Sequence, residues 1–324
     1  MLYRGILALA FVAAAAACAT SAPTPVDAPV ALPAPDYVIA DPAEASPIFA
    51  ADDDFMSRVS PADISVRLRQ PSGTKAELQA IYASAPQSWS AEERARLEAM
   101  IARRGPQTAI LSDYLPERIL LVKTDGSADT ALPHTRANAI NLGQALNPDD
   151  DELDRLFFHE LFHVLSRENS ARHEDMYALI NFRRCAFTPP PELADAMITN
   201  PDAPRVEWGA PLGDGLMVPV LVADPPRFDP VQPDFGSYFD LRFYRAQGQG
   251  DACALVLENG APVAVPPQEA MAAIHAAAGR NTTYVLHPEE ILADNFAQAM
   301  MGRTNEAPDP QVQHALLNWL DIPH

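Results

Sequence analysis

The order of apolar and polar positions predicts both helices and strands along the middle of the chain. Ser90 begins a capping-box pattern and Gly105 precedes a proline, so we expect a helix over about 90–104. The runs 118–124 and 137–142 are β-prone and are bounded by turn residues. We therefore expect two strands of a sheet to follow this helix.

Further along the chain, the pattern changes twice. Asn147 as a cap and Pro148 at the first helical position predict a helix that continues to about Ser166. Short apolar runs separated by glycine and proline predict a β-rich, antiparallel insertion at about 205–265. Helical patterns return at 267–278, 288–302 and 310–320. There is no internal repeat, and the pattern predicts an α+β fold.

The first residues are typical of an export signal. An apolar run to Ala17 follows one positive charge and is too short to span a bilayer as a helix. It ends in small residues before Cys18, which resembles the lipobox of bacterial lipoproteins, although Ala15 stands where that motif usually has Leu. We expect residues 1–17 to be a signal peptide and Cys18 to be lipidated. Cleavage without lipidation and an uncleaved anchor are the alternatives, and all three export the chain.

Residues 18–50 are rich in proline and poor in large apolar side chains. This composition is typical of a semi-rigid tether, which in polyproline II geometry extends about 3.1 Å per residue. A disordered leader without a function would have the same composition. We expect the folded domain to begin near residue 55 and to occupy 55–324.

The charge balance excludes one class of partner. The 324 residues include 43 acidic and 23 basic side chains, for a formal net charge of −20, and Lys75 and Lys123 are the only lysines. Such a surface repels nucleic acid and anionic lipid. We therefore expect no nucleic-acid partner.

The cysteines agree with export. If Cys18 takes the lipid, Cys185 and Cys253 remain, and an even pair in an oxidising compartment predicts a disulfide. Two separate buried thiols are the alternative.

The segment His159-Glu160-Leu161-Phe162-His163 carries the chemistry. Residues four apart lie on one face of a helix, so both histidines can bind one metal ion at about 2.0–2.1 Å. Glu160 flanks that face and can reach a water beside the metal. The surrounding residues are apolar nearly all round, which predicts a buried helix whose polar groups would be costly without a metal. Histidines that are only hydrogen-bonded in the core are the alternative.

A third ligand must come from elsewhere in the chain. Ser166 and Asn169 exclude the continuation that metzincins use. Candidates by residue type are Glu289, Glu192, His173 and Asp175. Downstream, Pro288 begins a second predicted helix that contains two adjacent glutamates and an aspartate.

The pair Glu290 and Asp294 beside H-E-x-x-H resembles the gluzincins, the zinc peptidases that include thermolysin. The resemblance implies a zincin-like fold in which a small sheet packs on the H-E-x-x-H helix and a second helix carries the third ligand. It implies that Glu290 binds Zn²⁺ and that Asp294 supports a ligand histidine. Glu289 is rotated by about 100° on the helix, so we expect it not to bind and its replacement to have little effect. An ordinary acidic first turn is the alternative.

The same resemblance implies zinc-dependent hydrolysis of peptide bonds by a metal-activated water, with Glu160 as the catalytic base. A residue that donates to the oxyanion is also expected, from the set Tyr284, His287, Tyr238, Tyr244 and Arg136. The Gly-x-Met-x-Asn signature of aminopeptidases is absent, which favours an endopeptidase. The substrate would be a peptide or protein of the cell envelope, met by an enzyme that is lipid-anchored at the periplasmic face of a membrane or secreted.

A different function class stays open: a metal-stabilised envelope binding or assembly lipoprotein without catalysis. Such a protein would need the metal ligands but not Glu160, so the presence of this glutamate favours an enzyme. The cluster Asn200-Pro201-Asp202-Ala203-Pro204 is typical of a turn, and we assign it no chemistry.

Overall fold

The computed structural model describes residues 33–127 and 132–323. The expected signal peptide, 1–17, and Cys18 lie outside the described residues. The helices are α1 (Pro42–Phe49), α2 (Asp54–Arg58), α3 (Pro61–Leu68), α4 (Lys75–Ser84), α5 (Ala91–Arg104), α6 (Asp150–Glu168), α7 (His173–Ala178), α8 (Pro191–Ala196), α9 (Pro267–Ala278), α10 (Pro288–Met300) and α11 (Pro310–Trp319). The strands are β1 (Asp36–Ile39), β2 (Pro86–Gln87), β3 (Arg118–Thr124), β4 (His134–Arg136), β5 (Ala139–Asn141), β6 (Arg183–Arg184), β7 (Trp208–Leu212), β8 (Gly215–Ala223), β9 (Phe239–Gln247), β10 (Ala254–Leu255), β11 (Leu257–Glu258) and β12 (Ala261–Pro262).

A first sheet has the strand order β1-β3-β5-β4, with β2 paired to β3. The pairs β1–β3 and β3–β5 are parallel, whereas β4 at the edge is antiparallel to β5. Alternate residues of β3 point to opposite faces. Ile119 and Leu121 join the core that contains α5 and α6, and Leu120 and Val122 join a smaller core with α1 and α4. Helices therefore cover both faces of this sheet.

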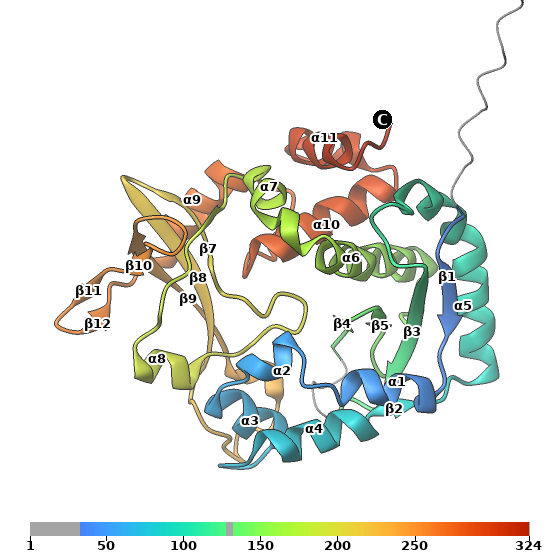
Figure 1. The fold of residues 1–324 in the computed structure, drawn as a ribbon, viewed down its shortest axis with the longest axis horizontal. Coiled ribbons are helices and arrows are strands. Elements are labelled where there is room, and N and C mark those ends of the chain that lie inside the picture. Colours follow the sequence, from blue (N-terminus) through green and yellow to red (C-terminus); the bar gives the residue numbers. More distant parts are fainter. Residues whose placement is uncertain (1–32, 128–131, 324) are drawn as a thin grey trace, which may run out of the picture. The chain divides into compact units, whose positions relative to one another are not determined.

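A second sheet of antiparallel strands, β6 to β10, lies on the side of α6 that is away from the first sheet (Figure 1). Its strands β7 to β10, together with the hairpin β11–β12, lie in the range 205–265 that the sequence predicts to be β-rich. Cys185 follows β6 and Cys253 precedes β10, and their sulfurs form a disulfide.

The helix α6 runs between the two sheets, and α10 lies alongside it (Figure 1). Its residues Phe157, Phe158, Leu161 and Phe162 are fully buried. The helix is capped by Asp149, whose side chain accepts from two backbone N–H groups, rather than by Asn147 as the sequence predicts. An N-terminal carboxylate is also favoured by the helix dipole.

The folded unit begins earlier than the sequence predicts. Residues 36–50, assigned above to the tether, form β1 and α1, and β1 pairs with β3. Phe49 is buried in the smaller core. Pro42 takes the first position of α1, where a missing N–H costs nothing. The prediction of a tether to residue 50 and a domain from 55 is therefore wrong at this boundary.

Helices and strands are mixed in the described residues, which is compatible with the α+β class. No helix in the described ranges is both long enough and apolar enough to cross a membrane.

Candidate metal centre

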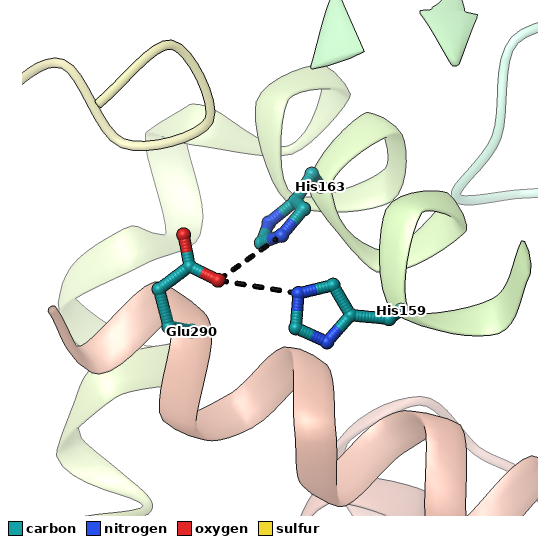
Figure 2. A group of neighbouring side chains, drawn as sticks. All are labelled: His159, His163 and Glu290. Atoms are coloured by element: carbon teal, nitrogen blue, oxygen red, sulfur yellow. Dashed lines mark hydrogen bonds and ion pairs between the residues drawn. The ribbon is translucent and has the colours of Figure 1, made fainter. Parts of the chain in front are cut away.

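Two histidines of α6 and one glutamate of α10 point toward one another (Figure 2). Oε2 of Glu290 lies 3.2 Å from Nε2 of His159 and 3.5 Å from Nε2 of His163. Two ligands at about 2.0–2.1 Å from a tetrahedral metal ion are about 3.3 Å apart. The three side chains expected as ligands therefore stand at the spacing of a shared ion, and they are among the groups that could hold one.

The local sequence explains how Glu290 reaches this position. Pro288 starts α10, and the His287 side chain caps the helix by accepting from the N–H of Glu289. Glu290 then falls in the first turn, at the positive end of the helix dipole. Because α10 packs along α6, this first turn faces the two histidines, although 127 positions separate Glu290 from His163.

Each histidine is oriented by a second carboxylate. Nδ1 of His159 lies 3.0 Å from Oδ1 of Asp294, and Nδ1 of His163 lies 3.0 Å from Oε1 of Glu289. A carboxylate can only accept, so each Nδ1 carries the proton and donates it. Each Nε2 faces Glu290 and is the nitrogen at which a metal ion would replace a proton.

Glu289 is the residue whose expected role the structure changes. It does not face the shared position of the metal ligands, in agreement with the helical geometry. It nevertheless holds His163, and its Oε2 also accepts from Ser166 Oγ at 2.7 Å and from the Tyr177 hydroxyl at 2.5 Å. Three buried donors depend on this carboxylate, so these contacts predict a loss on its replacement, where the helical rotation alone predicted little effect.

The charges around the two imidazoles favour a cation between them. Burial alone would lower the pKa of His159, but its hydrogen bonds to Asp294 and Glu290 raise it to about 9. The carboxylates of Asp202, Glu290 and Glu289 likewise outweigh burial and raise the pKa of His163 well above its usual value. Burial opposes ionisation of Glu290, but the two imidazoles hold its pKa far below the usual value. A divalent metal ion would supply the positive charge that these carboxylates favour.

Glu160 lies beside this group, and one of its two carboxylate oxygens is buried without a hydrogen bond from any described residue. Its side chain is 3% exposed, and Oε2 has no hydrogen-bond partner in the described part of the chain. Burial, with a further contribution from the Asp202 carboxylate, raises the pKa of Glu160 to about 8. A buried carboxyl of raised pKa next to a metal-ligand set is typical of a residue that exchanges protons.

The segment Asn200–Asp202 is part of the site, which contradicts the assignment of a plain turn. Asn200 Nδ2 donates to Oε1 of Glu290 at 2.5 Å, and Asn200 Oδ1 accepts from the N–H of Asp202. Asp202 Oδ1 accepts from the backbone N–H and the hydroxyl of Thr135 on β4. The segment thus links Glu290 to the edge strand of the first sheet.

A cavity of about 380 Å³ opens onto the site. Its polar lining residues include His159, Glu160 and Glu290. Its apolar lining residues include Leu132, Ile198, Leu221, Phe235, Phe239 and Leu286. Ligand pockets commonly combine an apolar wall with a few convergent polar groups.

Of the five residues proposed to donate to an oxyanion, Tyr284 is the one that lines this cavity. Its ring lies 6.3 Å from that of His159. Tyr238 is buried against Asp229, Tyr244 packs in the second sheet, and Arg136 pairs with Asp53. His287 caps α10 and its Nε2 contacts the Arg205 carbonyl.

The other candidates for the third ligand lie elsewhere. Glu192 and Asp175 are exposed on α8 and α7. His173 Nε2 contacts the hydroxyl and the carbonyl oxygen of Ser166, and the Ser166 hydroxyl in turn donates to Glu289. None of these three belongs to the ligand group that contains His159.

Comparison of the chain with protein-family models, with curated proteins and with solved structures gives no match. Function therefore has to follow from the chemistry of the site.

Proposed function

We propose that the protein is a zinc-dependent peptidase with a zincin-like fold. The observation that carries this proposal is the set of His159, His163 and Glu290 at metal-ligand spacing, with the unpartnered Glu160 beside it and a cavity in front. Two imidazoles and one carboxylate are a typical catalytic zinc set, since they leave a coordination position open.

The residues of the chain have separate tasks in this proposal. When bound, zinc supplies a Lewis acid for the scissile carbonyl and lowers the pKa of water. Glu160 accepts a proton from the attacking water and passes it to the leaving amine. Asp294 and Glu289 keep the two imidazoles in the tautomer that presents Nε2. Tyr284 is the residue whose hydroxyl can donate to the oxyanion.

The cavity favours a peptide that places an apolar side chain beside the scissile bond, because leucine, isoleucine and phenylalanine are among its lining residues. We propose an endopeptidase that acts on polypeptides of the cell envelope, anchored through a lipid on Cys18. The alternative remains a metal-stabilised binding or assembly lipoprotein, and the unpartnered Glu160 favours the enzyme.

Metal analysis and a peptide-cleavage screen of the purified full-length protein test the proposal. Glu160→Gln should keep zinc and fold but lose activity by about 100- to 10,000-fold, because the proton acceptor is removed and no ligand changes. Glu168→Gln, at the exposed end of the same helix, is the matched control and should remain active. Full activity in Glu160→Gln would refute the mechanism, and bound zinc without any cleavage by the wild type would favour the alternative.

A further inference from the structure

The kind of metal centre that the site can form depends on how many oxygens Glu290 gives to the ion. Two imidazoles and one carboxylate oxygen leave the fourth position of a tetrahedral zinc ion open, as in catalytic sites. If both oxygens of Glu290 were bound, the protein would supply four donor atoms, which is the number found in closed structural sites. The contacts of the two oxygens distinguish these cases.

The two oxygens of Glu290 have different partners. Oε2 lies 3.2 Å from Nε2 of His159 and 3.5 Å from Nε2 of His163, at the position that the proposed ligands share. Oε1 instead accepts from Nδ2 of Asn200 at 2.5 Å. Because a hydrogen bond to a charged carboxylate is stronger than one between neutral groups, this contact holds Oε1 toward Asn200 and leaves Oε2 to the imidazoles.

A second contact shows which end of the Asn200 amide faces Glu290. Oδ1 of the same side chain accepts from the backbone N–H of Asp202 at 3.1 Å, which forms an Asx turn. A backbone N–H can only donate, and an ionised carboxylate can only accept. Both contacts are satisfied together only when the NH₂ group of Asn200 points to Glu290.

The turn that carries Asn200 is held on both sides. Before it, the N–H of Thr199 donates to Asp63 at 2.8 Å, and the carbonyl of Thr199 accepts from Arg67 at 2.8 Å. Asp63 and Arg67 form a buried ion pair at 3.0 Å. After it, Asp202 is bound to β4 by the two hydrogen bonds described above. Supporting contacts of this kind fix the direction of a functional side chain before its ligand arrives.

We propose that Asn200 is a positioning residue of the metal centre, which keeps Oε1 of Glu290 off the ion so that one coordination position stays open. This inference rests on the proposed metal centre but not on peptidase activity. Asn200 lines the cavity of about 380 Å³ together with Glu290 and Glu160. A ligand in this cavity therefore meets the residue that sets the coordination of the ion.

The test compares Asn200→Ser with the wild type in the full-length protein. A serine hydroxyl can accept from the N–H of Asp202 in the same kind of turn, but it is too short to reach Glu290. Zinc affinity, measured by competition with a chelator, is expected to fall by about 10–100-fold, as for other residues that orient a ligand. The cobalt form is expected to absorb less visible light, because the released Oε1 can join the coordination sphere. Asn318→Ser, at an exposed position of α11, is the matched control and should change neither.

Thermal unfolding of the metal-free proteins separates this role from a structural one. An Asn200→Ser protein that unfolds at a lower temperature but keeps its zinc affinity and cobalt spectrum would overturn the inference. A crystal structure of the wild-type zinc form gives a measurement that needs no variant. Oε2 of Glu290 should lie about 2.0–2.2 Å from zinc, with Oε1 still bound by Asn200. Both oxygens bound to zinc, or an Asn200 side chain turned away, would also overturn it.

The two proposals can fail separately. Wild-type protein that binds no zinc overturns both. A protein that cleaves peptides and keeps its zinc affinity and cobalt spectrum in Asn200→Ser overturns only the role of Asn200. A protein whose zinc affinity and cobalt spectrum change in Asn200→Ser, but which never cleaves peptides, supports the positioning role and refutes the peptidase.

Discussion

Replacing Glu289 by glutamine is expected to weaken zinc binding about 10–100-fold while leaving the fold intact. The side chain is 1% exposed and accepts from His163, Ser166 and Tyr177 at 3.0, 2.7 and 2.5 Å. Glutamine has nearly the same volume, but it is neutral, and one of its two terminal groups donates. The substitution therefore removes the charge that orients His163 without opening a cavity.

The structure indicates how large the effect should be. Glutamine can keep its oxygen toward His163 and turn its amino group to the hydroxyls of Ser166 and Tyr177, which can rotate to accept. A loss of 10–100-fold then corresponds to about 1.4–2.7 kcal/mol. Glu289→Ala is more severe, because it leaves three buried donors unpaired at about 1–3 kcal/mol each. Since whole domains are stable by about 5–15 kcal/mol, the alanine variant should unfold at a markedly lower temperature.

Competition with a chelator measures the zinc affinity, and thermal unfolding of the metal-free protein measures the stability. Glu98→Gln, at an exposed position of α5, is the matched control and should leave both unchanged. If Glu289→Gln bound zinc as tightly as the wild type, Glu289 would not position His163. If Glu289→Ala unfolded at the wild-type temperature, the three hydrogen bonds would have no measurable value.

Three further predictions concern other parts of the molecule. Glu290→Ala should strip the metal, whereas Asp294→Ala should weaken zinc binding by about 10–100-fold because His159 loses its acceptor. Competition with a chelator measures the zinc affinity of both variants. Unchanged affinity in either variant contradicts the role assigned to that residue. Reduction of the Cys185–Cys253 bridge, which closes a loop of 68 residues, should cost about 4 kcal/mol in the chain-entropy model, seen in thermal unfolding; rapid labelling of both thiols without reductant would contradict the bridge. Burial lowers the pKa of His134 to about 4, so the unfolded chain, with a pKa of about 6.5, takes up a proton first as the pH falls. The contribution of His134 to stability should therefore be full above about pH 6.5, and the free energy of unfolding should fall by up to about 3 kcal/mol by about pH 4. Denaturant unfolding of the metal-free proteins measures this fall, which should be smaller in His134→Gln. An equal pH dependence in the two proteins would contradict the role of His134.

Sequence patterns predicted best the elements whose causes are local. The capping box at Ser90 and the basic last turn mark α5 within one residue, and the run 118–124 coincides with β3. The apolar residues of α6 predict burial on all sides, as observed. Helix spacing alone brings His159 and His163 to one face.

The same reasoning failed where proline has more than one use. Residues 36–50 contain prolines typical of a tether, but Pro42 begins α1 and Pro47 lies within it. Proline composition does not distinguish an extended linker from a series of short helices that each begin with proline. The short helix is distinguished from a linker by the burial of Phe49 against strands that are distant in sequence. A stretch of neighbouring residues contains no information on those strands.

The remaining parts of the site depend on long-range contacts. Asn200 is 90 residues from the glutamate to which it donates, and no spacing rule connects a turn to a helix at that distance. For Glu289, the helical rotation correctly excludes it from the ligand position. The rotation could not show that Nδ1 of His163 points toward the adjacent face, because that depends on how α10 packs against α6.

The division of the centre between α6 and α10 sets the order in which it can be completed during synthesis. The histidines emerge from the ribosome more than a hundred residues before Glu289, Glu290 and Asp294, which all arrive within two turns of one helix. A nascent or truncated chain that stops before Pro288 has both imidazoles but none of the carboxylates of α10 that orient and complete them. Tight metal uptake by the proposed centre is therefore a late event in synthesis, because it requires the chain to have been made through α10.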